Sequence, residues 1–263
     1  MRPLRNTTLI CAAILTWPLQ AAAQATTGVS QAASDVHWDV ATGIDYSTGR
    51  YGGASDTTIL SVPLAVRVQM DAFRLELTMP YLQVRGPDSF SSGAVIGGNS
   101  PVTTRSGLGD LTVGGAWTLT RDKPSMPGIE LEGTIKVPTA SPQLGTGKFD
   151  YSLQTNINHS ITPDVMLFGS VGYQWLSDFD GFHLKNGVMA QAGANYKSSA
   201  DTNIGFSVNY RQPYYQTLDE QLSLSPYVLW TFGRHWRISA YGIVGFTNAS
   251  PDAGGGMRLI FFN

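Results

Sequence analysis

Cysteine is nearly absent from this chain of 263 residues, in which Cys11 is the only one. Beyond that position, disulfides, thiol catalysis and cysteine-based metal sites are excluded. Charge is also scarce, since only 14% of the residues are Asp, Glu, Lys or Arg, against about 25% in typical globular domains. The formal net charge is only −2, and no basic cluster predicts nucleic-acid binding.

Long apolar runs are missing outside the first 25 residues, which have the three-part form of a secretory signal. A basic start with Arg2 and Arg5 precedes an apolar run over residues 9–17 and small residues over 21–25. The run is shorter than the ~20 apolar residues that span a bilayer as a helix. We therefore expect residues 1–25 to be a signal peptide, cleaved after Ala23 or Ala25, rather than a membrane anchor. Residues 26–263 would then form the mature domain.

Glycine and aromatic residues are plentiful, with 29 Gly, 11 Tyr, 11 Phe and 6 Trp. An exported, weakly charged chain of this composition, without an apolar run of helix length, is typical of a transmembrane β-barrel. A secreted β-sandwich is the alternative fold.

Apolar and polar residues alternate along the chain with the period of two that strands require. In residues 129–137, for example, aliphatic residues take one face, and Glu130, Glu132 and Lys136 take the other. The alternation predicts twelve strands, at about 36–47, 58–70, 72–85, 108–120, 129–137, 149–158, 164–176, 186–197, 202–212, 220–232, 235–247 and 255–263.

Two further patterns favour a barrel over a sandwich. Short and long connections alternate between the predicted strands, as periplasmic turns and external loops do in outer-membrane barrels. Aromatic residues of the apolar face, such as Trp38 and Trp175, fall near strand ends, where membrane barrels carry aromatic belts. An even number of strands then places both termini on one side, expected to be the periplasmic side. Pro63, Pro80 and Pro226 lie inside predicted strands, so we expect a bulge or a shifted boundary at each.

Three motifs follow one another between residues 107 and 150. They are Gly107-Leu-Gly-Asp110, Lys136-Val-Pro-Thr-Ala140 and Leu144-Gly-Thr-Gly147, the last followed by Asp150. Over about residues 105–175 the sequence resembles the outer-membrane family named for the meta-pathway of phenol degradation, with Ala140 where that family usually has Gly. The resemblance implies an outer-membrane barrel that acts as a transporter, and it implies no catalytic residue.

The polar face of the predicted strands would line the lumen of such a barrel. These residues either form a polar pathway that selects solutes, or they pair across the interior and fill it. A barrel of about twelve strands is near the size at which side chains alone nearly fill the bore. The candidate lumen-lining residues are Arg67, Arg74, Glu76, Asp110, Glu130, Glu132, Lys136, Asp150, Arg211 and Arg237, together with Asp39 and Asp45.

Signals for catalysis or metal binding are weak. Glu130 and Glu132 would lie about 7 Å apart along one strand, which suits acid–base chemistry, although paired charges on a wet face are commoner. His159 and Ser160 are adjacent and would point to opposite faces, so they do not form a catalytic dyad. We expect no catalytic, cofactor-binding or metal-binding residue.

Two loops have two interpretations each. Residues 85–107 either fold into the mouth as a constriction or form an external loop. Residues 178–182, with Asp178 and Asp180, either contact calcium or a solute, or form a simple turn.

The expected protein is therefore an all-β transmembrane barrel in the cell outer membrane, in contact with outer-membrane lipid. Its expected function is facilitated diffusion of a small hydrophobic or aromatic solute through the lumen or a lateral exit. No cofactor, enzyme activity or nucleic-acid partner is expected. The alternatives are a barrel enzyme that acts on lipid or peptide, and a structural or adhesion barrel whose external loops bind partners.

Overall fold

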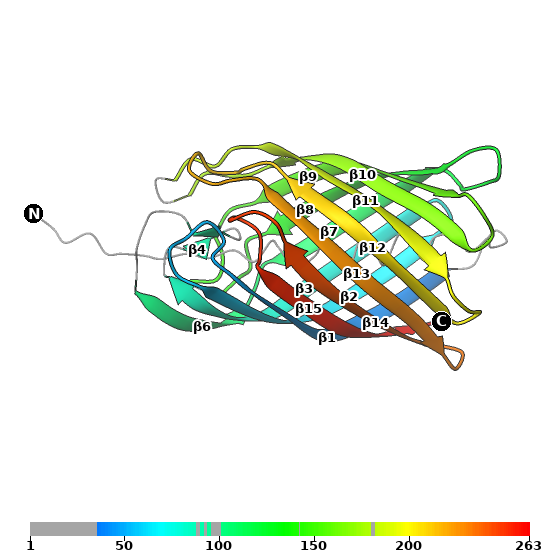
Figure 1. Ribbon diagram of the computed structural model, residues 1–263, viewed down its shortest axis with the longest axis horizontal. Helices are drawn as coiled ribbons and strands as arrows, with labels where there is room; N and C mark the ends of the chain where they lie inside the picture. The colour runs from blue at the N-terminus through cyan, green and yellow to red at the C-terminus, as the bar shows by residue number, and fades with distance from the viewer. Residues whose placement is uncertain (1–35, 88–89, 92–93, 96–100, 142, 180–181) are drawn as a thin grey trace, which may run out of the picture.

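The computed structural model describes residues 36–87, 90–91, 94–95, 101–141, 143–179 and 182–263. The expected signal peptide, residues 1–25, lies outside these ranges. Within them, no helix is long and apolar enough to cross a membrane. The described chain consists of β-strands that run obliquely around a long axis (Figure 1).

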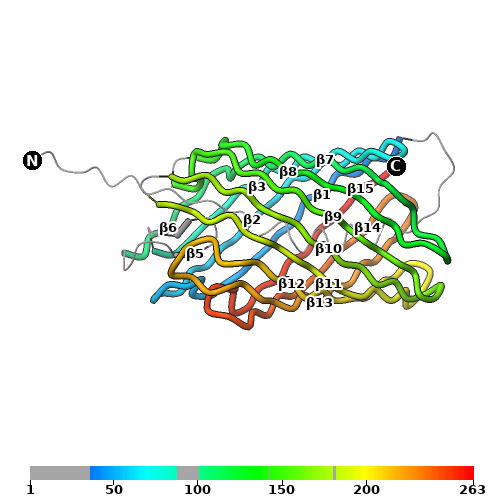
Figure 2. The backbone as a smooth tube through the Cα atoms, turned by 90° about the horizontal axis from the view of Figure 1, so that it is seen from above, coloured from blue at the N-terminus to red at the C-terminus, as the bar shows by residue number. Residues whose placement is uncertain are grey.

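The strands form one closed antiparallel barrel, and Figure 2 shows its wall from a second direction. β1 pairs with both β2 and β15, which joins the first strand to the last. β6 and β7 share one place in the wall because both pair with β3, so twelve strand positions surround the interior. The strands of the wall are β1 (Val36–Gly49), β2 (Thr57–Met70), β3 (Phe73–Pro87), β6 (Val102–Leu108), β7 (Leu111–Thr120), β8 (Gly128–Val137), β9 (Asp150–Ser160), β10 (Val165–Trp175), β11 (Gly187–Lys197), β12 (Thr202–Arg211), β13 (Gln221–Phe232), β14 (Trp236–Gly245) and β15 (Ala253–Phe262). β4 (Phe90–Ser91) and β5 (Ala94–Val95) form a separate two-stranded sheet.

The alternation in the sequence gives the barrel an apolar outside and a largely polar inside. On β2, Leu64 points outward and is 53% exposed, whereas Ser61 points inward and is 1% exposed. On β10, Val171 is 56% exposed on the outer face. Successive side chains of a strand point to opposite faces, so each strand repeats this division. The outer face is a band of exposed apolar side chains, which is typical of a surface that faces lipid.

Aromatic side chains gather near both ends of the outer face. Near the short turns, the rings of Phe73 and Trp117 stack with centroids 5.7 Å apart. Near the long loops, the rings of Tyr173 and Trp175 pack edge to face at 5.1 Å. The prediction of aromatic residues at strand ends is confirmed, and their placement is typical of the two membrane interfaces.

The two ends of the described barrel meet at the edge that carries the short turns. The Asn263 side chain donates a hydrogen bond to the Val36 carbonyl (2.9 Å) and accepts one from the Trp38 backbone N–H (2.8 Å). Val36 also pairs with Met70, which directly precedes the turn between β2 and β3. The termini of the barrel therefore lie on one side, and the assignment of that side to the periplasm stays a prediction.

Residues 85–107 are not the irregular loop that the sequence predicted. β3 continues to Pro87, and its residues from Tyr81 onward pair with β6. The reason is that the two faces also alternate in β6, where Arg105 is buried and Val102 and Leu108 are 49% and 48% exposed. Residues 88–89, 92–93 and 96–100 of the expected loop lie outside the described residues.

The three prolines behave differently from one another. At Pro80, β3 changes partner: Thr78 pairs with Thr112 of β7, and Tyr81 pairs with Leu108 of β6, one residue out of register. The expected irregularity is confirmed there. At Pro63 and Pro226 the register does not change, so the expected bulges are wrong. Because proline has no backbone N–H, the hydrogen-bond ladder from each of these two prolines to one neighbouring strand is interrupted locally. The continuous ladder to the other neighbouring strand keeps the register.

Candidate functional site

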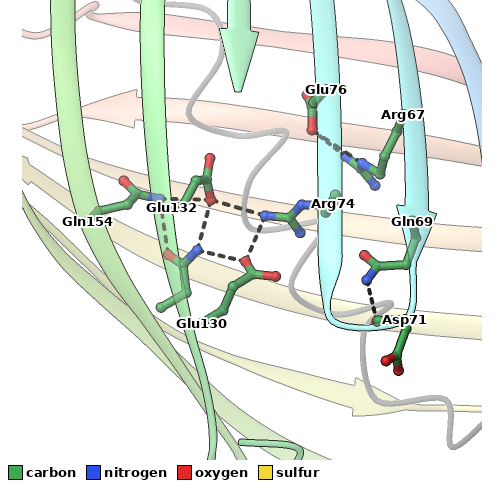
Figure 3. Close-up of polar contacts among 9 residues, drawn as sticks. Arg67, Gln69, Asp71, Arg74, Glu76, Glu130, Glu132 and Gln154 are labelled. Carbon is green, nitrogen blue, oxygen red and sulfur yellow. Dashed lines mark hydrogen bonds and ion pairs between the residues drawn. The ribbon is translucent and has the colours of Figure 1, made fainter. Parts of the chain in front are cut away.

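The short-turn half of the interior contains an ion-pair network centred on Arg74 of β3. One guanidinium nitrogen of Arg74 donates to Glu130 (2.7 Å) and to Glu132 (3.1 Å), both on β8. Figure 3 shows these side chains pointing toward one another inside the barrel. Arg74 is only 8% exposed, so the two carboxylates share a largely desolvated cation.

Amides from β9 complete this network. The Asn156 side chain donates to Glu130 (3.1 Å) and to Glu132 (2.8 Å), and Gln154 donates to Glu132 (3.3 Å). Both carboxylates therefore accept hydrogen bonds from the same guanidinium and the same amide. This geometry is typical of a structural network that joins neighbouring strands.

A second group of charges lies beside the first on β1, β2 and β3. Arg67 contacts Glu76 at 3.1 Å and Asp39 at 3.8 Å, so one cation again serves two carboxylates. Arg237 of β14 makes a different contact: it donates to the Thr231 hydroxyl (3.2 Å), and its guanidinium lies over the Phe262 ring.

The long-loop half of the interior contains two further groups of paired charges. Lys136 contacts Asp150 at 2.6 Å and Asp110 at 3.4 Å. Arg258 of β15 contacts Asp45 at 2.6 Å, and both side chains are almost fully buried. The structure thus brings most of the sequence-predicted charges into a few compact groups on the inner face that contain both signs, whereas Arg211 and Arg237 lie over the rings of Tyr214 and Phe262.

Arg258 is an interior residue that the sequence analysis missed. It pairs with Gly43 of β1 and Ser239 of β14, and its side chain is 2% exposed. The sequence did contain a signal for its inward position. Arg258 alternates with the apolar Met257, which is exposed on the outer face, and it shares its own face with Gly254 and Gly256. The glycine-rich start of β15 conceals the alternation that would have assigned the faces.

Apolar side chains form a buried cluster at the long-loop end of the barrel. Those on β2 and β3 point inward, and side chains from four loops between strands fold in to meet them. We call this group the mouth cluster; it consists of Tyr51, Ile59, Leu82, Val84, Leu144, Leu176, Tyr214 and Leu218.

Hydrogen bonds tie the loops of the mouth cluster to neighbouring loops and strands. The Lys185 backbone N–H donates to the Tyr214 carbonyl (2.8 Å), and the Ser177 N–H donates to the Asp150 carboxylate (3.0 Å). The Gly52 N–H donates to the Asn248 carbonyl (2.7 Å). These bonds fix the positions of the loops at the long-loop end of the barrel.

A third interior region is apolar and partly aromatic. We call it the apolar wall; it consists of Met166 and Phe168 on β10, Tyr227 and Leu229 on β13, and Tyr241 on β14. The networks of Arg67 and Arg74 lie on β1, β2, β3, β8 and β9. The strand order places these two sets on different halves of the barrel.

Two weaker motifs from the sequence have ordinary structural partners. Asp122 lies outside the strands and accepts hydrogen bonds from the His159 ring (3.0 Å) and the Ser160 backbone (2.9 Å). Burial raises the pKa of the Asp122 carboxyl, but the hydrogen bonds from Ser160 and His159 outweigh burial and lower it below its ordinary value. His159 and Ser160 thus both bind one carboxylate.

The loop at residues 178–182 also forms local contacts. Asp178 accepts from the His183 ring (2.7 Å) and from the Leu184 backbone N–H (2.8 Å), and these bonds lower the pKa of Asp178. Asp180, the other aspartate of the expected ligand pair, lies outside the described residues. In the part of the chain that the structure describes, no group of three or more His, Cys, Asp or Glu could hold a metal ion.

Solved structures with the same fold are outer-membrane barrels. An outer membrane channel from Pseudomonas putida F1 matches with a TM-score of 0.66 and 15% identity, covering 90% of this chain and 98% of that one. The KdgM porin matches with a TM-score of 0.54 and 9% identity, over 85% and 98% of the two chains. The translocator domain of the autotransporter NalP from Neisseria meningitidis matches with a TM-score of 0.51 and 10% identity, over 98% and 99%. At these identities the likeness shows the fold alone.

Sequence comparison supplies the family. No curated protein matches the sequence. One family model, described as "Putative MetA-pathway of phenol degradation", matches residues 20–261 and thus nearly the whole chain. The predicted resemblance is therefore confirmed, and the chain belongs to this family of phenol-degradation MetA-pathway proteins.

Proposed function

We propose that the protein is an outer-membrane channel through which a small hydrophobic or aromatic solute crosses by facilitated diffusion. The observation that carries the proposal is the division of the barrel interior. The apolar wall occupies one part of it, and the networks of Arg67 and Arg74 occupy another. A small aromatic compound with one polar group could contact both parts at once.

The mouth cluster supports the same class of solute. A solute that enters from the long-loop end meets apolar side chains first, including Leu144 and Leu218. A sugar, which is hydrated over its whole surface, would lose more hydration among these side chains than a solute with an apolar ring would. The cluster therefore favours solutes that carry an apolar surface over sugars.

The proposed location is supported by the outer face and by the expected signal peptide. The band of exposed apolar residues and its aromatic ends suit a lipid bilayer. Together with the signal peptide expected at residues 1–25, these features support our proposal that the barrel lies in the outer membrane with its termini in the periplasm. The family name, which refers to phenol degradation, agrees with an aromatic solute.

Uptake by cells tests the proposal. Cells that lack their general porins, with and without this protein, would be given radiolabelled benzyl alcohol or radiolabelled arabinose. We expect the protein to raise the initial rate of benzyl alcohol uptake and to leave arabinose uptake nearly unchanged. Equal benzyl alcohol uptake with and without the folded protein would contradict the proposal.

A matched pair of variants shows whether the solute uses the interior. Ser170 points inward on β10, and its neighbour Val171 points outward. Ser170→Trp should slow uptake because the indole occupies the interior, whereas Val171→Trp should leave uptake unchanged. Equal effects of the two substitutions would argue against a route through the barrel.

A further inference from the structure

Beneath the mouth cluster lies the arginine Arg211, which has a side-chain nitrogen without a hydrogen-bond partner among the described residues. Arg211, at the end of β12, is 5% exposed, and within the described chain its Nη2 atom is buried without a hydrogen-bond partner. Asp150 attracts Arg211 electrostatically, but that carboxylate is bonded to Lys136 (2.6 Å) and to the Ser177 N–H (3.0 Å). A buried guanidinium is costly unless an acceptor meets it.

A second unused donor lies beside the first. The Tyr214 side chain is 2% exposed, and its hydroxyl is also buried without a partner among the described residues. The Arg211 guanidinium carbon lies 4.3 Å from the centre of the Tyr214 ring. Burial raises the pKa of the Tyr214 hydroxyl, so it keeps its proton and remains a donor.

Apolar side chains surround this pair of donors. Tyr214 belongs to the mouth cluster and packs within it together with Tyr51, Leu144 and Leu218. The site therefore combines two neighbouring donors, one of them cationic, with surrounding aliphatic and aromatic side chains.

We propose that Arg211 and Tyr214 form a binding site for an aromatic carboxylate. One carboxylate oxygen accepts from Arg211 Nη2 and the other from the Tyr214 hydroxyl, while the ring lies among the apolar side chains of the mouth cluster. A carboxylate has two acceptor oxygens, and bonds between charged partners are the strongest of their kind. This inference rests on the proposed channel function and narrows its solute to aromatic acids.

Calorimetric titration of the purified barrel in detergent tests this site directly. The probes are benzoate, benzyl alcohol as the neutral analogue, and acetate as the carboxylate without a ring. We expect benzoate to bind at least about tenfold more tightly than either analogue. Benzyl alcohol lacks the carboxylate, and acetate lacks the aromatic ring. Benzyl alcohol or acetate binding as tightly as benzoate would overturn the proposal.

Three variants assign the binding to the named residues. Arg211→Gln should weaken benzoate binding about tenfold or more, and Tyr214→Phe should weaken it less, because it removes only a neutral donor. The control is Arg50→Gln, which removes an exposed arginine at the same end of the barrel. Heat-dependent mobility on gels confirms that each variant is folded. If Arg211→Gln folds poorly, Tyr214→Phe and the three probes still decide the question.

The outcomes separate this site from the channel function. Benzyl alcohol uptake by cells, together with benzoate binding that Arg211→Gln and Tyr214→Phe leave unchanged, would overturn the proposed site but not the channel function. Arg211-dependent benzoate binding without any solute uptake would support the site and overturn the channel.

Discussion

Single buried charges determine how the interior of this barrel is held together. Arg74 forms ion pairs with Glu130 and Glu132, which lie far from it in the sequence, and all three side chains are largely buried. Removing one partner from a buried ion pair leaves the other charge desolvated and unpaired. Arg74 is therefore expected to be among the most important polar residues for stability.

Arg74→Met is expected to destabilise the folded barrel by about 3–5 kcal/mol, because it leaves two buried carboxylates without their shared cation. The measurement is the free energy of unfolding in urea, for barrels refolded into lipid vesicles. Arg121→Met serves as the control, since Arg121 and Asp71 form an exposed pair with exposures of 52% and 74%. Such a pair contributes about 0–1 kcal/mol. Equal losses in the two variants would contradict this account of Arg74.

The sequence predicts which charges face inward but not which charges meet. Alternation alone places Arg74, Glu130 and Glu132 on the inner face. Their contact depends on the register by which β3, β7 and β8 pair. Alternation determines only which face of the sheet each residue takes, and several registers are compatible with the same faces. Arg211 was predicted to line the lumen, but its unused donor depends on loops that only the folded chain brings together.

At the level of elements, glycines on the inner face make room for the rings of the apolar wall. A Cβ atom at Gly193 would lie 2.4 Å from the Phe168 ring, and one at Gly205 would lie 2.5 Å from the Tyr227 ring. The rings therefore lie close against the backbone of the neighbouring strands. Glycine in a strand often marks such a close approach.

Gly193→Val is expected to destabilise the barrel by about 1–3 kcal/mol, because the added side chain meets both the Phe168 ring and the backbone of β12. Gly115→Val is the matched control, because a Cβ atom at Gly115 meets nothing within 4 Å. Unfolding midpoints in urea compare the two variants. If Gly115→Val proved as harmful as Gly193→Val, the packing of rings on glycines would not explain the difference.

Strands were the most predictable elements, and irregular segments were the least. Twelve strand positions follow from the alternation, because each strand has one apolar and one polar face. β6 was not predicted, because its residues Val102–Leu108 carry large apolar side chains only at the two ends and fell almost entirely within the expected loop of residues 85–107. The mouth cluster was not predicted either, since its members come from loops with no periodic pattern.

The whole molecule combines a lipid-facing exterior with an interior of mixed character. The outer band, the closed sheet and the family membership agree on a membrane barrel. The interior carries the function that we propose, because the mouth cluster, the apolar wall and the charged networks lie along one enclosed space. The central claim is therefore that small aromatic compounds enter this space from the long-loop end.

Chemical labelling of one interior position tests that claim most directly. In a Cys11→Ser background, which contains no other cysteine, Ser170→Cys places a thiol on the inner face beside Phe168. Val171→Cys places the same group on the outer face, one residue away. Intact cells that carry each variant would receive a small benzyl thiosulfonate reagent or a bulky dextran-linked one. We predict that the benzyl reagent modifies Ser170→Cys much faster than Val171→Cys, and that the bulky reagent modifies neither. Modification of Ser170→Cys no faster than that of Val171→Cys would contradict entry of aromatic compounds into the barrel interior.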